Sequence, residues 1–138
     1  MPETTTLRAT GSFEVDLRPQ TPNEHEQAAG VGRMTIDKRF EGDLVATSVG
    51  EMLAAMTPFE GSAGYVAIER VSGALRGRKG SFVLQHTGLM DGGQPSLVIT
   101  VVPDSGTGEL AGLSGTMTID TSNGGHAYVF AYEIQSGK

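Results

Sequence analysis

The sequence predicts an all-β protein with a closed or nearly closed sheet. Runs in which apolar and polar residues alternate recur along most of the chain, as they do in strands with one buried face. Glycine supplies 20 of the 138 residues and interrupts these runs where the chain has to turn. The clearest example is residues 105–115, which hold four glycines and lead into the alternating residues 116–120.

The first two predicted strands flank a polar segment. Residues 7–17 place Leu7, Ala9, Gly11, Phe13, Val15 and Leu17 on one face. Residues 18–30 are polar and contain two prolines, so we predict a loop there. Residues 32–40 form the second strand, whose less polar face carries Met34, Ile36, Lys38 and Phe40.

The third strand is predicted over residues 43–56, and its end is ambiguous. The run alternates at first, but residues 51–56 (Glu-Met-Leu-Ala-Ala-Met) are good helix formers. A helical turn over 51–56 is therefore an alternative to a continued strand.

Five further strands follow. Residues 65–75 and 81–89 form a hairpin, with residues 77–80 as its turn. Residues 96–102 are apolar on both faces, which is typical of a strand covered on both sides. Residues 113–120 and 126–134 form a second hairpin across the Asn-Gly turn at 121–125.

Eight strands of this length make either a barrel or a sandwich. Closure into a barrel removes exposed sheet edges, and an eight-stranded barrel has room for side chains or one small ligand. A chain of 138 residues is long enough to bury one core, so we predict a single domain over residues 1–138.

Composition excludes several function classes. The net charge of −6 and the pI of about 4.9 argue against nucleic acid and anionic membranes as partners. The basic cluster Arg76, Arg78 and Lys79 is explained by a hairpin tip. Without cysteine there are no disulfides, thiolate nucleophiles or Cys-based zinc sites. No signal peptide or membrane-length apolar run is present, so we expect a soluble cytoplasmic protein.

Four segments, 34–38, 61–70, 80–86 and 102–115, resemble a family of small bacterial proteins of unknown function. That family has an allene oxide cyclase-like fold, so the resemblance implies a single eight-stranded antiparallel barrel over roughly residues 7–134. Residues 106–112 are also similar to the Gly-Thr-Gly motif of plant allene oxide cyclases and dirigent proteins, where the motif is structural. The plant enzymes bind a hydrophobic substrate inside the barrel, but the similarity here is one of fold.

Glu69 and His86 are the candidate catalytic residues. With Arg78 and Lys79 as the hairpin loop, they are diagonal neighbours, about 7–8 Å apart at Cα, on a face that also carries Tyr65 and Phe82. A carboxylate beside an imidazole in apolar surroundings is a general acid–base arrangement. Tyr65 and Phe82 would then line a ligand site. The alternative is a structural ion pair, or a solvent-facing pair if the opposite face, with Arg70, Gln85 and Thr87, lines the interior.

Three further polar residues have plainer interpretations. Glu51 would complete a polar group inside the barrel if its strand turns it inward, and is otherwise a surface carboxylate. His25, between two glutamates in a polar segment, has metal-ligand chemistry but no second histidine nearby, so we predict no metal site. His126 opens the last strand, where a rim position is expected. The sequence indicates no cofactor.

Three functions remain open: a barrel that binds a small apolar molecule, a cofactor-free isomerase or cyclase using Glu69 and His86, and a packed structural or interaction module. The first two functions require an internal cavity, and the third does not. We rank ligand binding first, and the sequence does not decide whether the protein is an enzyme. The apolar outer residues of 96–102 and of the last strand also predict a homo-oligomer.

Overall fold

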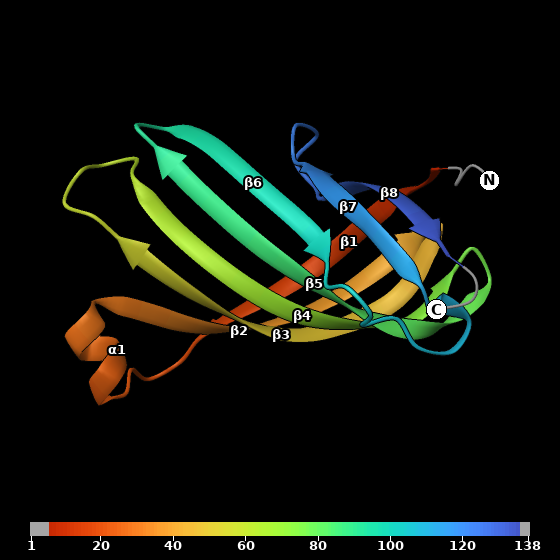
Figure 1. Ribbon diagram of the computed structural model, residues 1–138. Coiled ribbons are helices and arrows are strands. Elements are labelled where there is room, and N and C mark those ends of the chain that lie inside the picture. Colours follow the sequence, from red (N-terminus) through yellow and green to blue (C-terminus); the bar gives the residue numbers. More distant parts are fainter. Residues whose placement is uncertain (1–5, 136–138) are drawn as a thin grey trace.

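The computed structural model describes residues 6–135, and within them eight antiparallel strands close into a barrel in chain order (Figure 1). This confirms the predicted fold class and excludes the sandwich. The strands are β1 (Leu7–Pro19), β2 (Val31–Gly42), β3 (Leu44–Met56), β4 (Ala63–Leu75), β5 (Arg78–Asp91), β6 (Gln94–Val101), β7 (Leu113–Asp120) and β8 (Ala127–Ile134). The helices of the described residues are α1 (Glu24–Ala29) and the single 3-10 turn η1 (Gly108–Leu110).

The end of β3 is extended, so the helical alternative for residues 51–56 is wrong. Both neighbouring strands pair with this segment: Glu51 lies opposite Thr35 of β2 and Ile68 of β4. Hydrogen bonding to strands on both sides outweighs the modest helix preference of these side chains.

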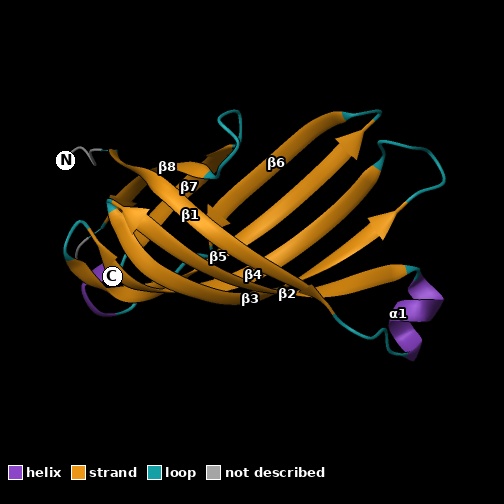
Figure 2. Ribbon diagram, turned by 180° about the vertical axis from the view of Figure 1, so that it is seen from behind, coloured by secondary structure: helices purple, strands orange, loops and turns teal. Residues whose placement is uncertain are grey.

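The polar segment before β2 contains a helix that the sequence interpretation missed. The Asn23 side chain accepts a hydrogen bond from the Glu26 amide, and the Glu26 side chain accepts one from the Asn23 amide. Gly30 then ends α1 in the left-handed conformation, with φ of 70°. Asn-x-x-Glu followed by glycine is a helix start and stop signal, which two nearby prolines obscured. In Figure 2 the helix projects from one end of the barrel.

The β4–β5 hairpin turns at Arg76 and Gly77, earlier than the predicted Arg78 and Lys79. Both turn residues have positive φ, 47° and 82°, as a two-residue hairpin turn of this hand requires. Glycine at the second position makes this turn cheaper than one formed by arginine and lysine. Glu69 therefore lies opposite Leu84 rather than Gly88, and His86 is still its diagonal neighbour.

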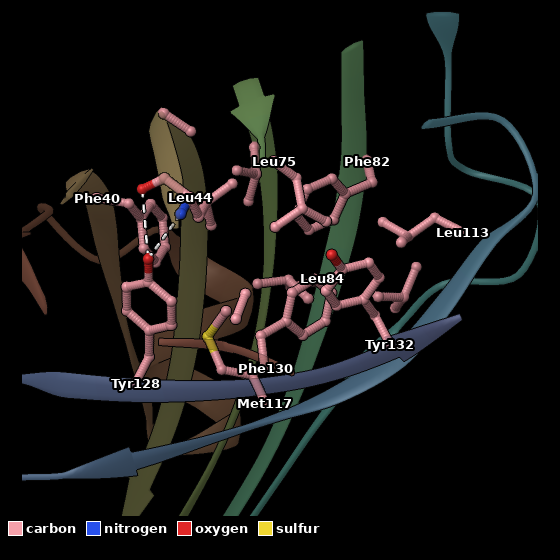
Figure 3. Packing of buried hydrophobic residues seen from close by; sticks show 14 of the residues in the cluster. Phe40, Leu44, Leu75, Phe82, Leu84, Leu113, Met117, Tyr128, Phe130 and Tyr132 are labelled. Carbon is pink, nitrogen blue, oxygen red and sulfur yellow. Dashed lines mark hydrogen bonds between the residues drawn. The ribbon is translucent and has the colours of Figure 1, made fainter. Parts of the chain in front are cut away.

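The packed core fills one end of the barrel (Figure 3). The Phe82 and Phe130 rings stack with centroids 5.7 Å apart. The Tyr128 hydroxyl accepts a hydrogen bond from the Leu44 amide and donates one to the Glu41 carbonyl, each at 2.9 Å. This end is therefore closed by side chains, and space inside the barrel lies further along the same strands.

β6 is held unequally by its two neighbours. It pairs with β5 along its whole length, from Gln94 to Val101. Within residues 6–135 it pairs with β7 only through Ile99 with Met117 and Thr100 with Thr116. Within the single chain Val98 points outward and is 55% exposed, so a cover for that face of β6 would have to come from another molecule, and the predicted cover on both faces stays a prediction.

Candidate functional site

A pocket of about 160 Å³ lies inside the barrel, beyond the packed core. Its walls come from six strands and the residue before β8, all through positions that face inward. The lining residues are Phe13, Val15, Leu17, Ile36, Lys38, Met52, Tyr65, Ala67, His86, Ile119 and His126.

A buried polar cluster lies at this pocket. One oxygen of Glu69, Oε2, accepts a hydrogen bond from Lys38 Nζ at 2.7 Å and lies 2.6 Å from His86 Nε2. The three residues are 0%, 8% and 4% exposed, respectively. The Lys38 ammonium also lies 4.9 Å from the centroid of the Phe13 ring, a cation–π distance.

The cluster keeps Glu69 ionised. Burial acts to raise its pKa, but the hydrogen bond from His86 and the charge of Lys38 outweigh burial and lower the pKa to about 2. Burial and the nearby charge of Glu69 raise the pKa of Tyr65, which stays a neutral phenol at the pocket wall.

Two buried polar atoms at the cluster have no hydrogen-bond partner among the described residues. They are Glu69 Oε1 and the hydroxyl oxygen of Ser48, which lies opposite Lys38 on β3. Buried polar atoms without partners are costly and uncommon. Both residues are neighbours of Lys38, which lines the pocket.

Two glycines make room for the site. A side chain at Gly50 would start 2.6 Å from the Cα atom of Glu69, its cross-strand partner. A side chain at Gly88 would start 2.2 Å from the ring of Tyr65. The Tyr65 ring therefore lies over bare backbone, which sets its position at the pocket wall.

An apolar groove of about 300 Å³ adjoins the pocket. It is lined by residues of both strand faces at the ends of β3 to β6, and it shares Met52 and Tyr65 with the pocket. Leu89, Met90 and Leu97 add apolar surface to it and are themselves partly exposed. The polar cluster is thus reached past a largely apolar mouth.

The structure brings three of the five predicted site residues together. Glu69 and His86 are in contact, and Tyr65 lines the same pocket. Phe82 does not line it, because Phe82 is packed among core residues at the closed end. The opposite face of the hairpin, with Arg70 and Gln85, points outward.

Glu51 lies outside the barrel, which corrects its expected interior position. The inward residues of β3 are Ser48, Gly50 and Met52, so a residue between them must point outward. Its side chain is 60% exposed and pairs with Arg33 at 3.1 Å. It lines a separate outer groove of about 950 Å³ between α1 and the wall formed by β3, β4 and β5.

Lys38 and His126 are site residues that the sequence interpretation missed. Lys38 occupies the less polar face of β2, between Ile36 and Phe40, and a lysine in that phase is a detectable signal of a buried charge. His126 faces inward and stacks on Phe13 at 4.9 Å between ring centroids. Its position next to a turn gave no such signal.

The described residues contain no group of three or more histidine or acidic side chains arranged to hold a metal ion. His25 is exposed on α1 and lines the outer groove. No helix within residues 6–135 is long and apolar enough to cross a membrane.

Comparison with known proteins gives the fold's relatives. Residues 9–132 match the family described as Protein of unknown function (DUF3224). A crystal structure of a protein of unknown function from that family, from Shewanella oneidensis MR-1, is 52% identical with a TM-score of 0.87. The match covers 98% of this chain and 100% of that one. No curated protein matches the sequence.

Proposed function

We propose that this chain, which belongs to the DUF3224 family of proteins of unknown function, binds a small apolar molecule inside its barrel. The observation that carries the proposal is the interior pocket, which shares Met52 and Tyr65 with the apolar groove at the barrel mouth. Binding sites are typically concave and mostly apolar with a few convergent polar groups, and this pocket has that character.

A solidly packed interaction module is disfavoured by the same space. The core residues fill one end of the barrel, but the pocket and groove remain open along β3, β4 and β5. A module that needed only stability would gain from filling this space with larger apolar side chains. A cytoplasmic location, and the likeness to allene oxide cyclases, stay predictions from the sequence.

A second candidate is a cofactor-free isomerase or cyclase. The contact that favours it is the one between Glu69 and His86, with Lys38 on the same carboxylate oxygen. In this proposal the imidazole of His86 carries a proton to and from the ligand, and Glu69 holds the ring in place. The Glu69 carboxylate itself is too well stabilised as an anion to act as the acid near neutral pH.

Native mass spectrometry of protein purified from its own cells tests ligand binding. We expect a retained small molecule in the natural protein. Ala67→Phe places a ring in the pocket and should abolish retention. Thr87→Phe adds the same ring to the outer face of the neighbouring strand β5 and should retain the molecule.

Loss of retention in both variants would show that the molecule is not held in the pocket. For the enzyme candidate, His86→Asn should stop conversion of the molecule in folded protein to which the molecule is still bound. Unchanged conversion in that variant would rule out the assigned proton carrier.

A further inference from the structure

The size of the interior pocket limits what it can hold. A cavity of about 150 Å³ lined by apolar side chains is large enough to bind benzene. The pocket here, at about 160 Å³, therefore matches one six-membered ring. The side chains of Ile36 and Met52 and the ring of Phe13 give it walls suited to such a ring.

The polar wall of the pocket offers hydrogen-bond donors. An ammonium group has three N–H donors. Lys38 gives one of them to Glu69, and no other acceptor for Lys38 is found among the described residues. Lys38 and His86 both line the pocket. A ligand in the pocket can therefore approach the two N–H donors of Lys38 that Glu69 does not use.

Acceptors are scarcer on that wall. Glu69 Oε2 is already shared by Lys38 and His86, and Oε1 is fully buried. Glu69 itself is not among the pocket's lining residues. With Nε2 directed at Glu69, His86 has Nδ1 left, which accepts a hydrogen bond when the ring is neutral and donates one when it is protonated.

The charges of the cluster point the same way. Lys38 and Glu69 cancel, so an anion entering the pocket meets no net negative charge. Protonation of His86 would add a positive charge and a second donor beside it. A cationic ligand would instead place its charge close to the Lys38 ammonium.

We propose that the pocket binds a compound with a single six-membered ring and a carboxylate, which accepts a hydrogen bond from Lys38. The ring lies among Phe13, Ile36 and Met52, and an apolar substituent extends past Tyr65 into the adjoining groove. This inference rests on the proposed ligand-binding function and refines it: the ligand is apolar except for one carboxylate, held in the same pocket.

Three probes with the same ring and different head groups test the proposal: benzoate, benzyl alcohol and benzylamine. Titration calorimetry on the full chain should give benzoate an affinity about tenfold higher than benzyl alcohol, the usual gain from a charge-assisted hydrogen bond. Benzylamine, a cation at neutral pH, should bind most weakly.

The place of binding is read from methionine methyl resonances. Benzoate should shift Met52, which lines the pocket, and leave Met117, which is buried in the core, unchanged. The double variant Lys38→Met, Glu69→Gln removes both charges and should lose the preference for benzoate over benzyl alcohol. Lys79→Met, at an exposed lysine, should keep that preference.

Each other outcome overturns part of the assignment. Benzyl alcohol binding as tightly as benzoate, with a shift at Met52, would refute the carboxylate and leave ligand binding intact. Decanol shifting Met52 where no ring compound does would refute the ring. Failure of all four probes to shift Met52 would count against both the ligand class and the proposed function. If the double variant does not fold, the order of the three ring probes on the natural protein still decides.

Discussion

Glu69 has no exposed surface, yet it is ionised, and one of its two carboxylate oxygens accepts hydrogen bonds from both Lys38 and His86. A buried carboxylate on its own would be neutralised by proton uptake. Lys38 and His86 reverse that tendency, and breaking the group by removing one partner leaves an uncompensated charge. Glu69 therefore affects both the stability of the fold and the charge at the pocket wall.

Acid should destabilise the protein through this residue. The folded-state pKa of Glu69, about 2, lies below its ordinary value of 4.5, so its stabilising contribution is present above pH 4.5. That contribution declines as pH falls toward 2, with a total on the order of 3 kcal/mol. Urea unfolding between pH 7 and pH 2.5 measures it.

The control is Glu69→Gln, which cannot titrate. The difference in free energy of unfolding between natural protein and variant should shrink as pH falls through the window from 4.5 to 2. Parallel pH curves for the two proteins would contradict the assigned pKa.

For single residues, the sequence predicted which way a side chain faces better than it predicted which side chains touch. Alternation along 65–75 and 81–89 put Glu69 and His86 on one face, and that face lines the interior. Strand phase in β3, taken strictly, would also have placed Glu51 outside beside Val49 and Leu53. What alternation does not contain is the contact of Lys38 with Glu69, because that contact joins β2 to β4 over the intervening strand β3.

Among the elements, α1 is the clearest addition to the sequence interpretation. It has six residues, too few to be stable alone, so its ends and its neighbour must hold it. Asn23 caps its start, and Glu26 binds Arg33 of β2 at 2.8 Å. Proline at 19 and 22 favoured a loop, but the capping residues lie after both prolines.

Asn23→Ala should loosen α1 without unfolding the barrel. Loss of a helix cap costs about 1 kcal/mol, which corresponds to roughly fivefold faster local opening. Hydrogen exchange at the amides of Glu26, Gln27 and Gly30, all bonded in or around the helix, reports this change.

His25→Ala is the matched control, because His25 is exposed on the same helix and does not cap it. In this variant the same three amides should exchange no faster than in the natural protein. Equal exchange in both variants would show that the cap does not hold the helix.

On the scale of the whole molecule, the outer wall of β3 and β4 is unusually apolar. Val49, Leu53, Val66 and Ile68 point outward and are each between 42% and 66% exposed. Register places Leu53 beside Val66, whereas Ile68 lies opposite Glu51 and Val49 lies opposite Arg70, so charged side chains border the apolar ones. Exposed apolar surface bordered by polar residues is typical of an interaction surface.

We propose that this apolar surface joins two copies of the chain, in line with the oligomer predicted from sequence. Light scattering at micromolar concentration should give the mass of a dimer. Ile68→Lys should reduce the mass to that of a monomer, since it places like charges across a two-fold interface. Thr118→Lys, at an exposed position on β7, should not. A monomer mass for the natural protein would refute the proposal.

The sequence-based argument for an oligomer pointed to other strands. Residues 96–102 looked apolar on both sides, but Leu97 faces the groove and Ile99 faces the core. Val98 of that strand does point outward, but more outward apolar residues lie on β3 and β4, where they alternate with inward ones and so look ordinary in the sequence. Closure of the sheet could be predicted from the sequence. Which outward side chains lie next to one another could not, because that depends on the register between strands.

The short pairing between β6 and β7 determines where the barrel should open first when it is heated. Breaking it leaves the backbone of Gln94–Val101 facing outward on one side, still fixed to β5 in extended form. Such an edge is a template on which the same strand of another molecule can be exchanged or added. Pro95, which has no N–H to offer, interrupts that template near its end. On heating, the pairing between β6 and β7 should therefore open before the packed end of the barrel, which is held by stacked rings, unfolds. Molecules opened in this way should associate through β6.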